Sequence, residues 1–407
     1  TDLAGALGER GGTAGASRQR LSRLLVVGEV ATSVALVAAT ALLLRSFASL
    51  EAVDLGFERS GVVTFALEAP GWGETHEEAA ALMTAYRDRI LAVPGVQAAG
   101  YSNRIPLAGG LFTGTVRSTE MLAAEVSPYE TSIRWISPGF LEALGARVKE
   151  GRAFASDDRH GTVLVDETAA RLLWPDGSAL GRRLEISVIG EDPIVAEVIG
   201  VVAPMKHDGV ADEPTATVYV PMLAAALQNF HYVAARVAGD PAAAVAPLRR
   251  AVREVDGDAV IARVRTMETL FDDDVAATRF ASFLLTVFGV LALALASVGL
   301  HGVMAYSVRR RAREIGIRVV LGATHGEIIG DALRSGAVLV LGGVTLGLLL
   351  ALGAGELLQS LLFGVAPRDA PTLVGAALAV AIVGLVSAYL PARIILGVDP
   401  AVALREE

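Results

Sequence analysis

The chain has 407 residues, of which 53% are hydrophobic, and it carries a formal net charge of -9 with no cysteine. The apolar share exceeds the roughly 45–50% of an ordinary soluble domain, so we expect part of the chain to lie in lipid. The acidic balance argues against nucleic acid as a partner, because Lys and Arg supply most of the affinity for phosphate backbones. Without cysteine, neither a disulfide nor a thiolate metal site can form.

The lysines exclude one nucleotide-binding motif. A P-loop needs Gly-Lys-Ser/Thr so that the lysine reaches the β and γ phosphates. The sequence has only Lys149 and Lys206, which follow Val148 and Met205. We therefore predict that these residues bind no nucleotide or other cofactor. The sequence starts at Thr1 without Met, and we expect it to be a fragment of a longer protein.

Four apolar runs are long enough to cross hydrocarbon. They are Leu24 to Leu44, Phe280 to Tyr306, about Ser335 to Gly355, and Thr372 to Leu390. Arginines precede the first run and fill the segment between the second and third, whereas the next connection has only Arg368 beside Asp369. The positive-inside rule therefore places both ends in the cytoplasm. A cleaved signal peptide is the alternative for the first run, but that run exceeds the usual length of about 7–15 residues.

The predicted fold class is membrane α-helical, with four transmembrane helices and one α+β extracytoplasmic domain. The predicted segments are a basic cytoplasmic linker (1–23), a first span (24–45), the extracytoplasmic domain (46–279) with a strand-rich insertion (about 103–230), a second span (280–306), a cytoplasmic loop (307–333), a third span (334–358), a short external loop (359–370), a fourth span (371–391) and a cytoplasmic tail (392–407). We expect the lipid bilayer as one partner.

Three residues stand out inside the spans. Gly343 and Gly347 have the small-xxx-small spacing that lets helices approach closely, although glycine is common in any membrane helix. Glu29 lies about one and a half turns inside the first span, where an ionisable side chain is costly and suggests function. Its alternative role is to reach back toward the cytoplasmic interface.

The extracytoplasmic domain has the pattern strand, helix, strand twice. The first set is Val62 to Glu68, Thr75 to Val93 and Val96 to Ser102, and the second is His231 to Val237, Pro241 to Val255 and Ala259 to Val264. Two such sets predict a split α/β sandwich. Further strands are predicted between them, at Ser132 to Ile136, Val163 to Asp166, Ile194 to Val202 and Thr217 to Val220.

We predict no catalytic or metal site in this domain, so the chain is not expected to be an enzyme. His76 with Glu77 and Glu78 is not the HExxH of a metalloprotease, which needs two histidines on one helical face. His160 and His207 lie beside aspartates but lack a full ligand set. The serines of the domain lie in no GxSxG setting.

The cytoplasmic loop is the most informative stretch. Glu314 and Arg318 have the favourable i,i+4 order and support a helix, and Gly322 is a plausible stop. Thr324 and Glu327 have the spacing of a capping box that starts the next helix. The pattern predicts a short basic helix between two spans. Its Ile315, Val319 and Val320 would face protein or membrane.

This loop, RRRAREIGIRVVLGA, resembles the signature of FtsX-like permeases, the MacB and LolC/LolE type of ABC transporter subunit. The resemblance extends over nearly everything after residue 20. It includes LLVVGEVATSVALVAATALLLRSF, WISPGFLEALG, VDETAARLLWPDGSALGRRL, VRTMETL and YLPARIILGVDPAVALREE. It implies a MacB-like periplasmic core and an FtsX-like permease domain at 280–400. More narrowly, the chain is similar to the C-terminal half of the duplicated orphan permeases (ADOP).

The resemblance implies a multi-pass protein of the bacterial inner membrane whose large domain lies in the periplasm. An ABC ATPase subunit would bind the ATP, and its motion would pass through the helices to the outer domain for export or extraction of a substrate. A second permease half or a second copy would complete the assembly. The ATPase would contact Arg313, Glu314, Ile315, Gly316, Arg318, Leu321, Gly322 and Ala323. Relatives have a basic series after the final Pro-Ala-Arg, whereas this chain has Ile394 to Gly397, which weakens the inference of a C-terminal contact.

The alternative is an FtsX-like signalling or scaffold protein, whose outer domain activates an extracytoplasmic partner. The large outer domain favours the transporter, and the membrane-anchored enzyme lacks every motif sought above. The substrate and the direction of transport cannot be read from these residues.

Overall fold

The computed structural model describes residues 3–69, 75–110, 112–158, 161–188, 192–222, 231–311, 314–315, 317–318, 321 and 323–395. It divides into two compact units, one made of Thr1–Ala52 with Ala277–Glu407 and the other of Val53–Ala276. We call them the membrane unit and the outer unit. The outer unit is thus inserted in the chain between two helices of the membrane unit.

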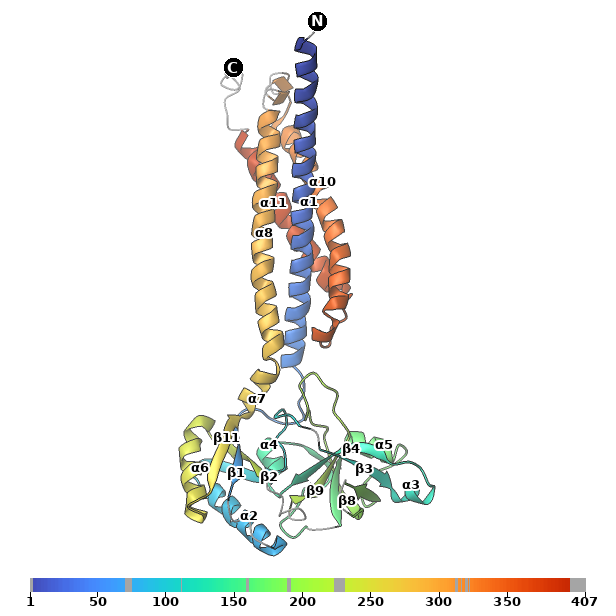
Figure 1. Cartoon of the computed structure of the whole chain (residues 1–407), viewed down its shortest axis with the longest axis vertical. Helices are drawn as coiled ribbons and strands as arrows, with labels where there is room; N and C mark the ends of the chain where they lie inside the picture. Colours follow the sequence, from blue (N-terminus) through green and yellow to red (C-terminus); the bar gives the residue numbers. More distant parts are fainter. Residues whose placement is uncertain are drawn as a thin grey trace. The chain divides into compact units, whose positions relative to one another are not determined.

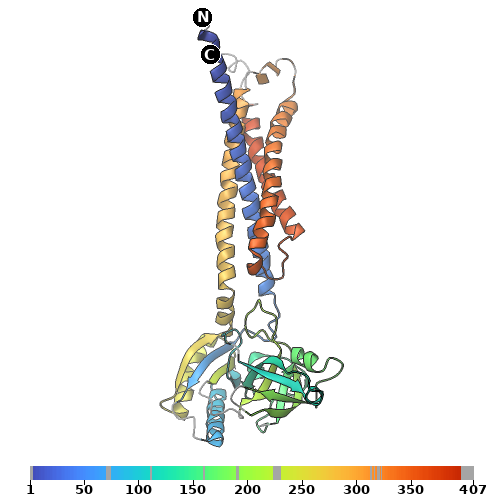
Figure 2. The same cartoon turned by 45° about the vertical axis from the view of Figure 1, so that its right-hand side comes forward.

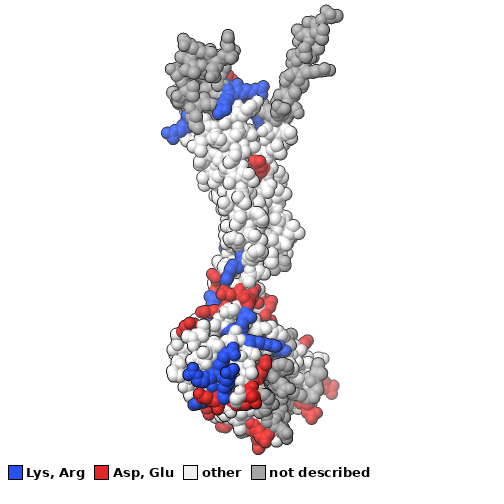
Figure 3. All heavy atoms as spheres, turned by 60° about the vertical axis from the view of Figure 1, so that its left-hand side comes forward, with Lys and Arg blue, Asp and Glu red and all other residues white. Residues whose placement is uncertain are grey.

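The membrane unit is a bundle of long helices that lie side by side (Figures 1 and 2). They are α1 (Leu3–Glu51), α8 (Ala276–Arg310), α10 (His325–Leu357) and α11 (Ala370–Ile395), and the short 3₁₀ helix η2 (Gln359–Leu361) follows α10. Within the described residues, each of the four contains a stretch long and apolar enough to cross a membrane. Figure 3 shows them as a mostly white surface, without Lys, Arg, Asp or Glu over most of their length.

The start of the chain differs from the prediction. The sequence indicated a linker over residues 1–23, but α1 is helical from Leu3 and continues without interruption into the first span. Helix nucleation is the costly step, and a span that is already helical extends into a neighbouring segment at little cost. The Ala, Leu, Arg and Gln residues of this stretch are good helix formers, and they outweigh its scattered glycines.

Glycines set the distance between α1 and α10. A Cβ at Gly343 would lie 2.5 Å from Cβ of Val30, and a Cβ at Gly347 would lie 2.6 Å from Cβ of Val34. Both valines are almost fully buried. A Cβ at either position would therefore push the two backbones apart. The small-xxx-small pair lies at a contact within the chain, in the core of the membrane unit.

Hydroxyl groups join α1 to α8. Oγ of Ser33 donates to the carbonyl of Ala292 and Oγ1 of Thr40 donates to the carbonyl of Leu285, both at 2.8 Å. The two contacts are seven residues apart on each helix. Small buried residues, Ser282, Gly289 and Ala296, recur on α8 with the same spacing. A seven-residue repeat is the pattern by which two helices keep one face in contact.

One half of the outer unit is a four-stranded antiparallel sheet covered by two helices. Its strands are β1 (Val62–Glu68), β2 (Val96–Ser102), β10 (His231–Val237) and β11 (Val260–Thr266), in the order β11-β1-β10-β2. The helices are α2 (His76–Leu91) and α6 (Pro241–Val255), and the short α7 (Met267–Asp274) follows β11. Thr75 forms the capping box of α2, and Pro241 starts α6. The two predicted strand-helix-strand sets are confirmed, and their strands interleave in one sheet.

The other half of the outer unit is the strand-rich part. It contains β3 (Thr113–Ser118), β4 (Tyr129–Ile136), β5 (Val148–Gly151), β6 (Thr162–Asp166), β7 (Arg183–Ser187), β8 (Ile194–Val202) and β9 (Thr217–Pro221), with short helices α3 (Thr119–Ala123) and α5 (Glu167–Leu173). The short helix α4 (Phe140–Leu144) packs instead on β2 and β10 of the four-stranded sheet. The pair Ser102 and Ile136 joins β2 to β4, so hydrogen bonds connect the two halves. The predicted strands β4, β6, β8 and β9 are present, whereas β3, β5 and β7 were not predicted.

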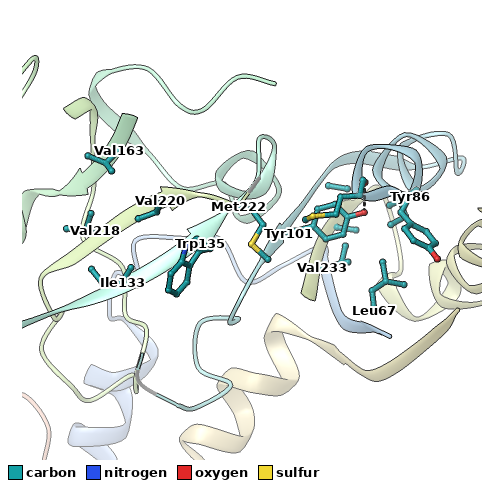
Figure 4. Close-up of a cluster of buried hydrophobic side chains, with 14 of the residues drawn as sticks. Leu67, Tyr86, Tyr101, Ile133, Trp135, Val163, Val218, Val220, Met222 and Val233 are labelled. Atoms are coloured by element: carbon teal, nitrogen blue, oxygen red, sulfur yellow. Dashed lines mark hydrogen bonds between the residues drawn. The ribbon is translucent and has the colours of Figure 1, made fainter. Parts of the chain in front are cut away.

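A buried hydrophobic core runs through both halves (Figure 4). Trp135 of β4 and Val220 of β9 lie in the strand-rich half, and Tyr101 of β2 and Val233 of β10 lie in the other. Met222 lies between Trp135 and Tyr101 in Figure 4 and links the two groups. The hydroxyl of Tyr101 is satisfied inside this core, because it donates to the carbonyl of Met83 at 2.9 Å.

Several polar side chains are buried on the opposite face of β4, β6 and β9. Arg134 is 2% exposed, and one of its amino groups lies 3.8 Å from the Asp208 carboxylate. Asp166 is fully buried, caps α5 by accepting from the amide of Ala169 at 2.7 Å, and accepts from the amide of Thr217 at 3.2 Å. Burial is the largest cause that raises the pKa of Asp166, to about 7.

The glycine contacts of α10 generate a first prediction. Gly343→Ala should lower the free energy of unfolding of the full chain by about 1–3 kcal/mol, because the added methyl group overpacks the contact with Val30. Gly353→Ala is the matched control on the same helix, because nothing lies within 4 Å of a Cβ there. Its helix propensity alone should leave stability equal or slightly raised. Thermal melts in one detergent would measure both, and equal losses would refute close packing at Gly343.

Asp166 generates a second prediction. A fragment of residues 53–276 should unfold cooperatively, and in it Asp166→Asn should become more stable relative to the parent as pH rises from about 4 to about 7. The folded parent holds the carboxyl proton more tightly than the unfolded chain, whose pKa is 3.8. The stability that the folded parent gains from holding this proton is fully present below pH 3.8 and is lost as pH rises through about 7. Asn cannot ionise, and it still caps a helix.

Urea unfolding between pH 4 and 8 would measure that difference. Asp240→Asn is the control, since Asp240 also caps a helix, α6, but at an exposed site. This substitution removes a capping carboxylate without changing a buried one, so it shows what the loss of a capping charge alone does to stability. A difference for Asp166→Asn that stays constant from pH 4 to 8 would refute the role assigned to burial.

Candidate functional site

The loop between α8 and α10 is the candidate site. Its described residues Glu314, Ile315, Ile317 and Arg318 are helical. The amide of Ile315 donates to the carbonyl of Arg311 at 2.8 Å, which continues the helical spacing from the end of α8. The predicted contact residues Arg313, Gly316 and Gly322 lie outside the described residues, and so do Val319 and Val320.

Arg318 forms ion pairs within the loop helix and with α10. Its guanidinium donates to Oε1 of Glu314 at 2.7 Å, the i,i+4 pair that the sequence indicated, and to Oδ2 of Asp331 at 3.0 Å. Asp331 lies in the second turn of α10, so one arginine connects the loop helix to the next span. All three side chains are at least half exposed. Exposed pairs of this kind orient a segment more than they stabilise it.

A capping box fixes the residue at which α10 starts. Oγ1 of Thr324 accepts from the amide of Glu327, and the carboxylate of Glu327 accepts from the amide of Thr324 at 2.8 Å. This is the predicted capping box, and it is present. Ala323 precedes it, and its amide donates to the carbonyl of Arg318 at 2.9 Å. The chain therefore leaves the loop helix and enters α10 at a defined point.

The apolar side chains of the loop have two roles. Ile315 is partly buried and, with Met304 and Val308 of α8 and Ile328 of α10, lines a small cavity of about 50 Å³. Ile317 and Leu321, in contrast, are 50% and 81% exposed. They are four residues apart and therefore share one helical face. The sequence pattern predicted that Ile315 faces protein or membrane, but it did not identify Ile317 and Leu321 as an exposed apolar pair.

The structure also places Glu29, the predicted intramembrane charge. It is an exposed residue of α1, and its carboxylate lies against Gly299 of α8. Glu29 and the loop are separate features, and no contact among the described residues brings them together. The glycines Gly343 and Gly347 belong to the α1–α10 contact described above.

The histidines of the outer unit do not form a metal site within the described residues. His207 is buried, and a hydrogen bond of 3.0 Å joins its Nε2 to the hydroxyl of Tyr219. His160 lies outside the described residues, as does the side chain of His76. Over the part of the chain that the structure covers, no group of three or more His, Cys, Asp or Glu side chains could hold a metal ion.

Comparison with known proteins gives two family matches. Residues 25–255 match the model of the MacB-like periplasmic core domain, and residues 286–400 match that of the FtsX-like permease C-terminal region. Together the matches include the first span, most of the outer unit, the loop and the last two spans.

The relatives that the chain matches are ATP-binding/permease proteins of export systems. The macrolide export ATP-binding/permease protein MacB of Chromobacterium violaceum is 27% identical over 286 residues, which are 68% of this chain and 43% of that protein. The pyoverdine export ATP-binding/permease protein PvdT of Pseudomonas putida is 28% identical over 280 residues, 63% of this chain and 40% of that protein. This chain spans less than half the length of these relatives.

Among solved structures, the periplasmic region of MacB from Actinobacillus actinomycetemcomitans aligns at 14% identity with a TM-score of 0.36. The alignment covers 53% of this chain and 92% of that one. The first family model alone matches more than half of the residues. The chain therefore belongs to the family of membrane permeases that combine a MacB-like periplasmic core domain with an FtsX-like permease C-terminal region.

Proposed function

We propose that this chain is the permease part of a MacB-type ABC transporter, and that it transmits motion from a cytoplasmic ATPase to its outer unit. The observation that supports the proposal best is the loop helix. It presents the exposed apolar pair Ile317 and Leu321, and Arg318 fixes it to α10 through Asp331. An exposed apolar pair on a basic helix is a surface that a protein partner would cover.

The connection to α10 gives the loop a mechanical role in this proposal. A force on the loop helix would reach α10 through the Arg318 ion pair and the capped start of that helix. From α10 it would reach α1, because Gly343 and Gly347 hold the two backbones in close contact. α1 leads directly into the outer unit along the chain. Closely packed helices transmit displacement because protein interiors are nearly incompressible.

The task proposed for this motion is export or extraction of a substrate on the outer side. The names of both relatives pair an ATP-binding part with a permease, and both name export. Those names give two chemically different cargoes, a macrolide and pyoverdine, so they do not indicate the substrate of this chain. A partner subunit would hydrolyse the ATP, and a second permease half or second copy would complete the transporter.

The proposed orientation has a direct test. The substitutions Val195→Cys, at a residue of the outer unit that is 48% exposed, and Leu321→Cys, in the loop, each introduce a single thiol, because the chain has no native cysteine. An impermeant maleimide on intact spheroplasts should label Val195→Cys and spare Leu321→Cys. After lysis both variants should react. Labelling of Leu321→Cys in intact spheroplasts, with Val195→Cys protected, would show that the topology is the reverse of the one proposed.

The coupling role is tested by reversing one charge. Glu314→Arg removes the partner of Arg318 and adds a like charge, which should cost the helix only about 0.2–0.5 kcal/mol because the pair is exposed. Arg318 keeps Asp331, so the fold should survive. At a docked ATPase surface, however, a like charge can cost several kcal/mol. ATP hydrolysis that co-purifies with the tagged chain from native membranes should therefore fall strongly.

Glu356→Arg is the matched control. Glu356 lies near the other end of α10, is about as exposed as Glu314, and forms a 2.7 Å pair with the exposed Arg368. Its reversal should lower the melting temperature as little as Glu314→Arg does and leave the co-purified hydrolysis unchanged. If both variants keep the hydrolysis of the parent, the loop is not the docking surface, and the FtsX-like scaffold becomes the better account.

A further inference from the structure

A lateral groove opens between α1 and α8 in the membrane unit. It has a volume of about 470 Å³, within the range of roughly 300–1,000 Å³ of small-molecule sites. Its walls are mainly leucines, which lie in the first turns of the span on α1 and on the facing part of α8. They are Leu21, Leu24, Leu25 and Leu295. Each of the four is more than half exposed, so no other described helix covers them.

Two polar groups interrupt this apolar lining, Glu29 and Thr32. They lie three residues apart on α1 and so on one helical face. Oγ1 of Thr32 donates its proton to the carbonyl of Gly28 at 2.9 Å, which leaves that oxygen as an acceptor. The carboxylate of Glu29 is also an acceptor. The groove therefore offers two acceptors and no side-chain donor among its lining residues.

Within the described residues Glu29 forms no ion pair. The residue lies five positions, or about 8 Å, beyond the start of the apolar run at Leu24. An unpaired charge at such a position is costly, and charges inside spans usually have a partner. Figure 3 shows an isolated acidic group on the otherwise white surface of the helices.

The structure makes room for this carboxylate. It lies against Gly299 of α8, and a Cβ at Gly299 would overlap Oε2 of Glu29. At Gly302, one turn further along α8, nothing lies within 4 Å of a Cβ. A glycine at position 299 thus allows α8 to close one side of the groove while the carboxylate stays at its wall.

We propose that this groove binds an amphiphile that carries a protonated amine. The amine would lie between the acceptors of Glu29 and Thr32, and the hydrocarbon chain would lie along the leucines. An ammonium group has three donors and no acceptor, which complements this lining in charge and in hydrogen bonding. The inference goes beyond the proposed function, because binding here requires neither an ATPase nor transport.

The test uses the full chain in lipid nanodiscs with a small fluorophore on Val298→Cys, because Val298 of α8 is 71% exposed and does not line the groove. The labelling is specific because there is no native cysteine. The probes are a nitroxide-labelled alkylamine and the nitroxide-labelled alcohol of the same chain length. The mole fraction in the lipid that gives half-quenching should be about tenfold lower for the amine than for the alcohol. Glu29→Gln, which keeps the shape of the side chain, should remove that preference.

Two glycine variants keep the test valid if Glu29→Gln folds poorly. Gly299→Ala leaves the charge but displaces the carboxylate, so the preference for the amine should fall. Gly302→Ala should behave like the parent. Equal quenching by amine and alcohol in the parent would overturn the proposal, and so would a preference that persists in Glu29→Gln. A disulfide between two unlabelled copies of Leu295→Cys, with no quenching by either probe, would assign the groove to a second copy instead.

Discussion

Helices in lipid gain little from burying apolar side chains, because the surrounding hydrocarbon is equally apolar. Their association must come from close van der Waals contact and from hydrogen bonds, and α1 uses one of these on each side. Toward α10 it meets Gly343 and Gly347, which leave no space for a methyl group. Toward α8 it donates hydroxyl hydrogen bonds from Ser33 and Thr40. The rest of the membrane unit depends on this central helix.

Helix α1 connects the two proposed functions of the chain, which are coupling to an ATPase through the loop and binding of an amine in the groove. It is one of the two covalent routes between the membrane unit and the outer unit, the other being α8, and the N-terminal half of its span carries Glu29. Arg318 of the loop helix pairs with Asp331 of α10, and α10 contacts α1 through the two glycines. A displacement of the loop would therefore change the position of α1 relative to α8, and with it the groove at Glu29. The groove and the loop would thus be coupled through one shared helix.

Segments with a regular hydrophobic pattern or a clear helix cap could be predicted from the sequence, because these signals are local. The spans, the helix start at Thr75, the capping box at Thr324 and the strands β8 and β10 follow from hydropathy, caps and alternation. Strand β5 (VKEG) could not be found in this way, because it is short and polar and owes its conformation to pairing with β8. Strand β7 (RLEIS) does alternate polar and apolar residues, but over only five residues, and its place is set by pairing with β3 and β8. Tertiary pairing overrides weak local preference.

Contacts between residues far apart in the sequence could not be predicted either. Asp331 as a second partner of Arg318, Gly299 beside Glu29, and the carbonyls that receive Ser33 and Thr40 all depend on how antiparallel helices align. The sequence showed that Glu29 and Arg318 are unusual but not what they touch. The start of the chain was assigned wrongly as a linker for a related reason, since the continuation of α1 depends on a helix that the span has already nucleated.

The proposed coupling requires that motion in the cytoplasm reaches the outer unit through the membrane helices. Spin labels at Val195→Cys in the outer unit and at Leu357→Cys, an exposed residue at the end of α10, would report it as one distance distribution. The transporter, purified with its ATPase in lipid, would be measured without nucleotide and then trapped with ATP and vanadate. We expect the distribution to shift on trapping and to return when the nucleotide is removed. An unchanged distribution, in a preparation that hydrolyses ATP, would contradict the coupling.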